Sequence, residues 1–456
     1  MAQERTLDVA ELIEGKKLGS AQISVALLLC TLMVLEGYDM QSLSFAAPAI
    51  LREWQVSRAD FGFVLSAHLF GYFFGALLLS YFGDRIGRKN IIVAGAVIFG
   101  AFTFGAGFAT GPQELWMWRF AAGFGLGGAI PTGIALAAEY MPTRVRATAI
   151  GLMFVGYNIG AGLGGFISAL TIQDFGWPSV FFIGGLAAVP MFILLAVALP
   201  ESVRFLVVRG GETAKIAAIA RKLRPEEDFS NVTRYVISEE KRTNSPASLF
   251  SDGRTAMTLL LWLAFIMSFL GHYVITAWMP TVLADDGYTI PQGNAAMGFF
   301  QFGGAVGSFL IAFLLDRVGI KIITITFLIA VPVVAALGLH TDYNILIMNM
   351  IVGGIAVLGG QIGLNALSGT IYPTFMRATG AGWGLGVGRV GSIIGPVVAG
   401  VLIGAGVARP TLLFLTAIPF FFCALALFAL TIAKRNQDER SGTPASALEK
   451  AGGFAH

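Results

Sequence analysis

Charged residues are scarce in this chain, and their scarcity argues against an ordinary soluble protein. Asp, Glu, Lys and Arg make up 12% of the 456 residues, whereas soluble proteins of this size carry about twice that fraction. The formal net charge is only +3, which is too small to indicate a nucleic-acid-binding protein. The composition therefore favours a protein whose main surroundings are lipid.

Groups that do covalent chemistry or bind metals are also few. The two cysteines, Cys30 and Cys423, lie in apolar segments at opposite ends of the chain, so they predict no disulfide framework. The four histidines share no metal-site spacing with Cys, Asp or Glu, and the Ser, Thr and His residues form no nucleophile or phosphate-loop pattern. The sequence therefore predicts no enzyme and no bound cofactor or metal.

Apolar residues dominate instead, at 56% of the chain, together with 58 glycines that allow helices to pack closely in lipid. A membrane-spanning helix needs about 20 apolar residues, and twelve segments qualify. The sequence thus predicts an all-α polytopic membrane protein with twelve transmembrane helices. The expected spans are 22–49, 60–82, 91–110, 114–138, 147–171, 178–199, 256–283, 294–315, 321–340, 343–368, 379–404 and 410–433.

The longest polar segment inside the chain separates these spans into two groups of six. With the N-terminus in the cytoplasm, 25 of the 30 Lys and Arg residues fall on the cytoplasmic side, as the positive-inside rule requires. The first residues mix acidic and basic side chains without a cleavage site, which indicates a tail and not a signal peptide. We expect an N-tail (1–21), a six-helix half (22–199), a cytoplasmic linker (200–255), a second six-helix half (256–433) and a cytoplasmic C-tail (434–456).

Two motifs recur at nearly the same offset, which indicates an internal repeat. GDRIGRK at 83–89 returns as LDRVGIK at 315–321, and PTRVRATAIG at 142–151 returns as PTFMRATGAG at 373–382. The offsets are 232 and 231 residues. A duplicated six-span half is typical of carriers whose halves move about a binding site near the middle of the membrane.

The same motifs carry a family resemblance. GDRIGRK resembles the signature loop of the major facilitator superfamily, and RFAAGFGLGGAIP at 119–131 resembles its fourth-helix arginine–glycine motif. EGYDMQSLSFAAPAI at 36–50, EYMPTRVRAT at 139–148 and GRVGSIIGP at 388–396 are similar to the aromatic acid:proton symporters of that superfamily. The resemblance implies import of benzoate-type or hydroxybenzoate-type anions. Glu36 departs from that family, which usually has aspartate there.

Two carboxylates lie inside the first predicted span. Glu36 and Asp39 are three residues apart and share one helical face. An ionised side chain near the bilayer centre costs about 2.5–3.5 kcal/mol, so these groups need a proton or a partner. We expect proton coupling, with static pairing to Arg119 as the alternative, and assign Glu139 to the same proton-coupling group.

Two arginines also lie inside predicted spans. Arg119 stays protonated when buried, so it can hold a span-one acid and release it. Arg389 lies about 17 Å from the cytoplasmic start of its span, and no acid lies near the middle of the spans after 256. We therefore expect Arg389 to grip a substrate carboxylate in a bidentate fork. Pairing with Glu36 or Asp39 in the empty carrier is the alternative.

Aromatic and amide side chains at similar depth complete the expected substrate site, although such groups also serve as lipid-facing packing or as links between helices. Aligning the repeats places Asn158 opposite Arg389. The histidines within spans, His68 and His272, fit packing better than a direct role. Besides Arg389, the expected substrate-binding residues are Tyr38, Tyr157, Asn158, Gln301, Gln361, Asn365 and Trp383.

Acid and arginine side chains recur in the loops predicted to face the cytoplasm. The resemblance implies that such sets close the inner gate, while simple retention of positive charge inside would also account for them. The expected gating residues are Asp84, Arg85, Arg88, Arg144, Arg146, Asp316, Arg317 and Arg377.

Together these features predict a proton-coupled carrier that imports an aromatic carboxylate across the bacterial inner membrane. We expect it to act as a monomer in lipid, with protons as the coupling ion, no other cofactor and no nucleic-acid partner. Ala161 stands where drug exporters of the superfamily tend to have proline, which favours symport. The alternatives are a proton-driven exporter, a carrier of non-aromatic organic anions, and a transporter-like sensor.

Overall fold

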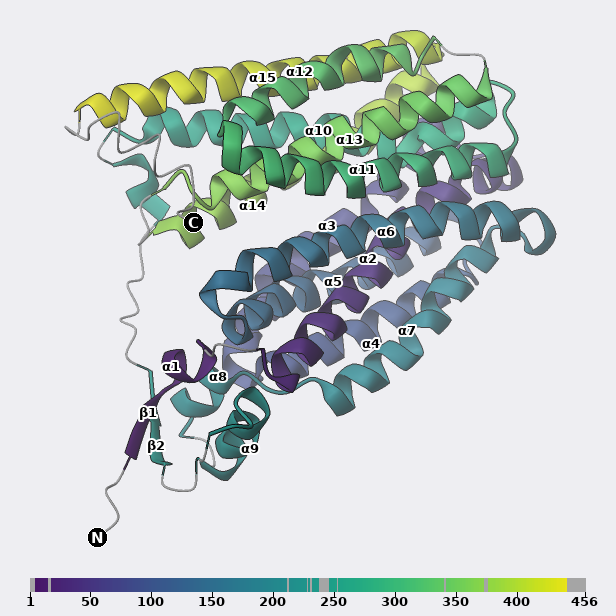
Figure 1. The fold of residues 1–456 in the computed structure, drawn as a ribbon. Helices are drawn as coiled ribbons and strands as arrows, with labels where there is room; N and C mark the ends of the chain where they lie inside the picture. The colour runs from purple at the N-terminus through teal and green to yellow at the C-terminus, as the bar shows by residue number, and fades with distance from the viewer. Residues whose placement is uncertain are drawn as a thin grey trace. The chain divides into compact units, whose positions relative to one another are not determined.

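The computed structural model of the chain is almost entirely helical (Figure 1). It describes residues 5–14, 18–210, 213–227, 229, 232–237, 246–251, 253–339, 342–372 and 376–440. In chain order the elements are β1 (Arg5–Asp8), α1 (Val9–Ile13), α2 (Ser20–Trp54), α3 (Arg58–Ile86), α4 (Arg88–Ala106), α5 (Pro112–Tyr140), α6 (Thr143–Phe175), α7 (Pro178–Ala198), α8 (Val203–Val208), α9 (Thr213–Leu223), β2 (Val232–Val236), the 3-10 helix η1 (Pro246–Phe250), α10 (Thr255–Asp285), α11 (Ile290–Val318), α12 (Lys321–Ala336), α13 (Tyr343–Ser368), α14 (Arg377–Gly404) and α15 (Arg409–Arg440).

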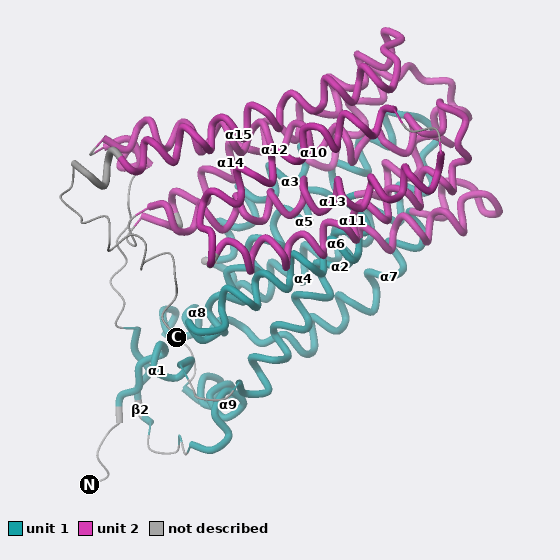
Figure 2. Tube along the Cα trace, turned by 45° about the horizontal axis from the view of Figure 1, so that its top comes forward, with its two compact units in different colours: residues 1–40, 70–160, 181–241 teal, residues 41–69, 161–180, 242–456 magenta. Residues whose placement is uncertain are grey.

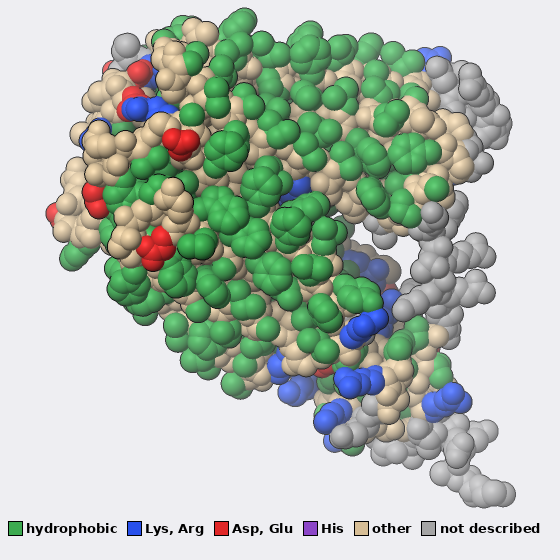
Figure 3. Space-filling view, turned by 180° about the vertical axis from the view of Figure 1, so that it is seen from behind, with side chains coloured by type: hydrophobic (Ala, Val, Ile, Leu, Met, Phe, Trp, Pro, Cys, Tyr) green, Lys and Arg blue, Asp and Glu red, His purple; other side chains and the backbone are tan. Residues whose placement is uncertain are grey.

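Twelve of these helices correspond one to one with the predicted spans. Eleven are long and apolar enough to cross a membrane, and the twelfth, α12, is apolar but has only 16 residues. The ends differ from prediction because helical backbone continues into polar sequence: α2 extends to Trp54, past Arg52. Figure 3 shows hydrophobic side chains over most of one face, with most charged side chains toward its margins. The prediction of twelve transmembrane helices is confirmed.

The structure forms two compact units (Figure 2), and each is described by itself. Unit 1 contains residues 1–40, 70–160 and 181–241, and unit 2 contains residues 41–69, 161–180 and 242–456. The boundary therefore falls within α2, α3 and α6 and within the first turn of α7, so each of these four helices contributes residues to both units.

Unit 1 depends on glycines that let helix backbones touch. At Gly71 of α3, an added Cβ would collide with the carbonyl oxygen of Phe120 in α5. At Gly127 of α5, it would collide with the carbonyl oxygen of Tyr72 in α3. Helices in lipid associate through such small residues because lipid provides no hydrophobic force to bring them together. The two helices therefore use reciprocal glycines along one seam.

Replacing Gly71 with Ala should destabilise the purified protein measurably, because the clash is with backbone that has little room to move. Overpacking of this kind costs about 1–3 kcal/mol. Thermal unfolding in detergent measures the effect. Gly151→Ala in α6 is the matched control, since a Cβ added at Gly151 would have no neighbouring atom within 4 Å. Equal midpoints for the two variants would contradict the proposed seam.

The N-terminal tail and the segment between the halves together form a small folded module that the sequence did not predict. β1 pairs in parallel with β2, with Leu7 opposite Tyr235. The amphipathic helix α9 buries Ile216 and Leu223 in the same cluster as Leu7 and Leu12. The predicted linker thus contains the amphipathic helix α9, and its strand β2 has a partner more than 200 residues away. Such distant pairing leaves no local pattern in the sequence.

Unit 2 is built from adjoining helix pairs: α11 lies against α13, α10 against α14, and α12 against α15 (Figure 1). The C-terminal part of α2 also belongs to it, because the Ser44 hydroxyl donates hydrogen bonds to the carbonyls of Thr276 and Ala277 in α10, at 2.6 and 2.9 Å. The Ser66 hydroxyl of α3 donates similarly to the carbonyl of Ile393 in α14. Hydroxyl-to-carbonyl bonds therefore join helices that are distant in sequence.

Candidate functional site

The predicted span-one acid Asp39 and the span-four arginine Arg119 meet in unit 1. The Arg119 guanidinium donates to an Asp39 carboxylate oxygen at 2.7 Å and to the Asp39 backbone carbonyl at 2.8 Å. Both side chains are 0% exposed. A charged pair so fully removed from water is retained only with good geometry and further hydrogen bonds.

Neighbouring helices supply those further contacts. The Thr103 hydroxyl of α4 donates to the same Asp39 oxygen at 2.9 Å. The Phe181 ring of α7 lies 5.6 Å from the Arg119 guanidinium carbon, in position for a cation–π contact. Four helices, α2, α4, α5 and α7, thus converge on one ion pair. Protonation of Asp39 would remove the negative charge that faces Arg119 in this pair.

The other two predicted residues of α2 lie beside this pair in sequence. Glu36 is 4% exposed and precedes Asp39 by three residues, so both occupy one face of α2. Tyr38 is 6% exposed and packs toward Gly184 of α7. The structure therefore buries every member of the EGYD sequence that was expected to act.

Glu139 lies apart from the Asp39 pair, at the other end of α5. Twenty residues of helix separate it from Arg119, which corresponds to about 30 Å. Its carboxylate pairs with Arg88 at 2.9 Å and accepts a hydrogen bond from the Ser202 hydroxyl at 2.6 Å. The structure thus groups Glu139 with a predicted gating residue instead of with the buried acids.

Glu201 completes this group, and sequence reasoning missed it. One carboxylate oxygen accepts hydrogen bonds from the backbone N–H groups of Arg88 and Lys89, at 2.9 and 3.2 Å. These are the first N–H groups of α4, which have no partner within their own helix. In the sequence, Glu201 is marked only by its position directly after Pro200, which does not indicate that it contacts α4. Glu201 therefore joins the end of α7 to the start of α4.

The remaining predicted gating residues have local contacts. The Arg85 guanidinium lies 4.5 Å from the Tyr81 ring, and Arg317 lies 4.0 Å from the Phe313 ring. Arg146 and Arg377 each donate to a backbone carbonyl five residues earlier, and Arg144 is exposed. The side chains of Asp84 and Asp316 lie outside the part that the structure describes.

In unit 2, Arg389 of α14 lies among aromatic rings of α10. Its guanidinium carbon is 5.7 Å from the Phe269 ring centre, and one of its N–H groups donates to the Tyr273 hydroxyl at 3.4 Å. Gly388 and Gly391 make this approach possible, because an added Cβ would collide with Phe269 or with the backbone of α10. The arrangement puts a fixed positive charge beside flat apolar surface.

Amide side chains of α13 approach α10 at Ser268, next to Phe269 in sequence. The Ser268 hydroxyl donates to Gln361 at 2.5 Å, and the Gln361 amide donates to Asn365 at 3.2 Å. Gln301 of α11 is 0% exposed, and neither its amide nitrogen nor its carbonyl oxygen has a hydrogen-bond partner in the described structure. A buried amide without partners is costly.

The other predicted substrate residues have separate surroundings. Trp383 is 45% exposed and stacks on Trp262, with ring centres 6.0 Å apart, so the structure does not show it against Arg389. Tyr157 is half-buried and Asn158 is 4% exposed, both in the part of α6 that belongs to unit 1. The expected substrate residues are thus divided between the two units.

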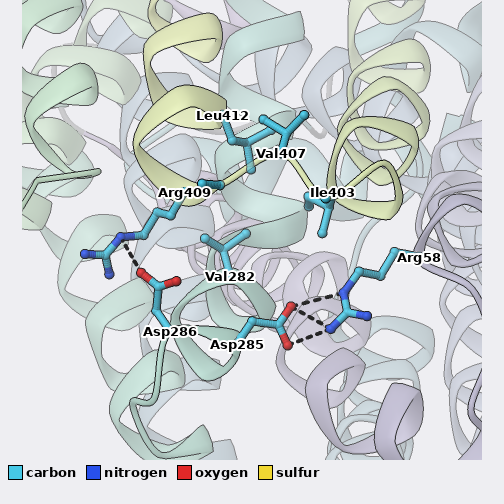
Figure 4. Close-up of a pocket in the computed structure, with 10 residues that line it drawn as sticks. Arg58, Val282, Asp285, Asp286, Ile403, Val407, Arg409 and Leu412 are labelled. Carbon is cyan, nitrogen blue, oxygen red and sulfur yellow. Dashed lines mark hydrogen bonds and ion pairs between the residues drawn. The ribbon is translucent and has the colours of Figure 1, made fainter.

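A pocket of about 350 Å³ lies elsewhere in unit 2 (Figure 4). Arg58 forms an ion pair with Asp285 at 2.7 Å, and Arg409 forms one with Asp286 at 2.9 Å, with apolar side chains such as Val282 between them. Both arginines already face carboxylates, so this pocket lacks the unclaimed cationic group that an anion would need. Among the described residues, no group of three or more His, Cys, Asp or Glu side chains could hold a metal ion.

Several known proteins that are similar to this chain are transporters of aromatic acids. The chain is 38% identical to a gallate transporter of Pseudomonas putida, over 93% of this chain and 95% of that protein. It is 34% identical to the 4-hydroxybenzoate transporter PcaK of Acinetobacter baylyi (94% and 95%), and 30% identical to a benzoate transport protein of the same organism (88% and 87%). These relatives are transporters and not enzymes.

Solved structures show the same fold at low identity. A D-xylose-proton symporter matches with TM-score 0.69 and 17% identity, over 90% of this chain and 97% of that one. A bacterial homologue of the human lysosomal transporter Spinster matches with TM-score 0.67 and 17% identity, over 97% and 100%. A family model described as Major Facilitator Superfamily matches residues 29–321 and 261–453. The chain is therefore a transporter of the major facilitator superfamily, with its twelve-helix fold.

Proposed function

We propose that this protein imports an aromatic carboxylate together with protons by alternating access. The observation that carries the proposal is the position of Arg389, a permanent positive charge beside the rings of Phe269 and Tyr273. A benzoate-like anion has the matching parts, a carboxylate for the guanidinium fork and a flat ring for the aromatic surface. The gallate, hydroxybenzoate and benzoate specificities of the relatives support this substrate class.

Proton coupling is the second part of the proposal, and it is assigned to Asp39, Glu36 and Arg119. When Asp39 is ionised, it satisfies the buried guanidinium of Arg119. When Asp39 takes up a proton, Arg119 loses its counter-charge in surroundings where an isolated charge is costly. That cost favours a rearrangement of the helices that meet at the pair, and release of the proton reverses it.

The other predicted residues take supporting roles in this proposal. Within unit 2, Gln301, Gln361, Asn365 and Trp383 would add polar and aromatic contacts to a substrate bound at Arg389. Within unit 1, Tyr38, Tyr157 and Asn158 stay the residues predicted to contact substrate. Glu139 with Arg88 and Glu201 would hold helix ends on the cytoplasmic side, together with the gating arginines. We assign the protein to the bacterial inner membrane as a monomer, with both termini in the cytoplasm and the 200–255 segment as linker.

Uptake by purified protein in liposomes tests the proposal. Labelled 4-hydroxybenzoate should accumulate when the outside is more acidic than the inside, and an ionophore that collapses the pH gradient should remove the accumulation. Protein-free liposomes are the control, because protonated aromatic acids cross lipid unaided. Uptake that is unaffected by the ionophore would remove the coupling claim. Competition by dicarboxylates or sugar acids, but not by benzoates, would remove the aromatic substrate class.

A further inference from the structure

We propose that His272 is the specificity-determining residue of the transport site, where it hydrogen-bonds a ring hydroxyl of the aromatic acid. The inference rests on the proposed function, because it needs the carboxylate to be bound at Arg389. It names a narrower substrate class than that function does, namely phenolic acids in preference to benzoate itself.

His272 occupies the face of α10 that carries the rest of the site. Phe269, His272 and Thr276 follow one another at intervals of three and four residues and therefore share one helical face. The His272 side chain is 7% exposed, and its Nδ1 atom is buried without a hydrogen-bond partner in the described structure. A buried ring nitrogen left without a partner costs free energy, so this site has a hydrogen-bonding position to fill.

Tyr273 places that position close to the carboxylate-binding arginine. The ring centres of His272 and Tyr273 are 4.9 Å apart, and the hydroxyl of Tyr273 accepts from Arg389 at 3.4 Å. One aromatic residue thus contacts both the histidine and the arginine. A substrate whose carboxylate binds Arg389 and whose ring lies along these aromatic side chains brings its substituents toward His272.

The groups on the other side of His272 are already engaged with one another. Ser268, one turn earlier on α10, donates to Gln361, which in turn donates to Asn365. Because these hydroxyl and amide groups satisfy each other, they compete less for a substrate hydroxyl. On α10 itself, the Nδ1 atom of His272 has an unfilled hydrogen-bonding position, and neutral imidazole can donate or accept there.

The distinction from benzoate follows from that unfilled position. A hydroxyl that reaches Nδ1 forms a hydrogen bond where none exists in the empty site, whereas benzoate leaves the nitrogen buried and unsatisfied. Sites built to hydrogen-bond a substrate hydroxyl discriminate strongly against analogues that lack it. We expect wild-type protein to bind at least one hydroxybenzoate about tenfold or more tightly than benzoate.

Binding to the purified transporter tests this with four acids: benzoate, 3-hydroxybenzoate, 4-hydroxybenzoate and 3,4,5-trihydroxybenzoate. His272→Phe keeps an aromatic ring but removes the nitrogen. It should weaken binding of the preferred hydroxylated acid about tenfold and change benzoate binding less than about twofold. His272→Gln, which retains a donor and an acceptor, should recover part of the preference. His68→Phe in α3 is the matched control and should leave the affinity ratio unchanged.

The ligands also allow a test that needs no variant. Methylation of the preferred hydroxyl to a methoxy group should lower affinity for wild-type protein, because it removes the donor and adds a methyl group beside a side chain that is only 7% exposed. Equal affinity of wild-type protein for benzoate and every hydroxybenzoate would overturn the inference, as would an unchanged ratio in His272→Phe. Either result would leave the proposed function intact if 4-hydroxybenzoate uptake still followed the pH gradient. Failure of folded wild-type protein to bind any of these acids would overturn both.

Discussion

Arg389→Ala should abolish measurable binding of the transported aromatic acid, with a loss of affinity of about 100-fold or more. Hydrogen bonds to charged groups contribute about 1.5–3 kcal/mol each, and a bidentate grip on a carboxylate uses two of them. Arg389→Lys should retain weak binding, because lysine keeps the charge but lacks the planar fork. Thermal-shift titration of purified protein measures both, since a ligand that binds the folded state raises its unfolding temperature.

The control for Arg389→Ala is the removal of one arginine that lies outside the proposed site. Arg435→Ala, at an exposed position near the end of α15, should bind the substrate like wild type. If Arg389→Ala bound the same acid with wild-type affinity, Arg389 would not hold the carboxylate, and the other polar groups of unit 2 would have to replace it in the proposal.

Asp39→Asn should remove proton-driven accumulation and also destabilise the protein by about 3–5 kcal/mol, the usual cost of breaking a buried ion pair from one side. The substitution leaves the Arg119 guanidinium at 0% exposure without its carboxylate. Thermal unfolding measures the stability, and uptake in liposomes under a pH gradient measures the coupling. Accumulation at the wild-type level would show that Asp39 does not carry the coupling proton.

The chain provides a matched ion pair for comparison. Arg58 and Asp285 form a bidentate pair in unit 2, but each side chain is 38% exposed. Exposed pairs contribute about 0–1 kcal/mol, so Asp285→Asn should change the unfolding midpoint little. The contrast between the two substitutions separates the effect of burial from the loss of a carboxylate as such.

A double substitution separates coupling from packing. Replacing Asp39 with Leu and Arg119 with Met removes both buried charges, and such replacements are often neutral or stabilising. If the pair only held helices together, the double variant would regain stability and still accumulate substrate. We expect it to regain stability without accumulation, because the Leu and Met side chains cannot exchange a proton and Glu36 alone lacks the Arg119 partner that the proposed coupling needs.

The spans and the buried ion pair could be predicted because both follow from the strong preference of lipid for apolar side chains. Twenty apolar residues have few uses other than a membrane span, and a charge inside such a span needs a partner. Asp39 and Arg119 were therefore conspicuous in the sequence, and the structure pairs them. The short helix α12 was found in the same way, even though it has only 16 residues.

The residues that the sequence did not reveal are those whose role depends on a distant partner. Thr103 and Ser268 are ordinary hydroxyls in apolar helices, where bonding to their own helix is common. Nothing local shows that they reach Asp39 and Gln361. Glu139 lies in a sequence that resembles a family motif. The resemblance did not show that Glu139 would pair with Arg88, the first residue of α4.

The pairing of β1 with β2 has a consequence for how the protein is made. The ribosome produces residue 8 about 230 residues before residue 236, so the first strand has no partner while six spans enter the membrane. At about 5–20 residues per second, that interval lasts on the order of 10–45 seconds. The β1–α1 segment is thus among the last parts of its unit to fold, and until then its apolar residues Leu7 and Leu12 stay available to chaperones.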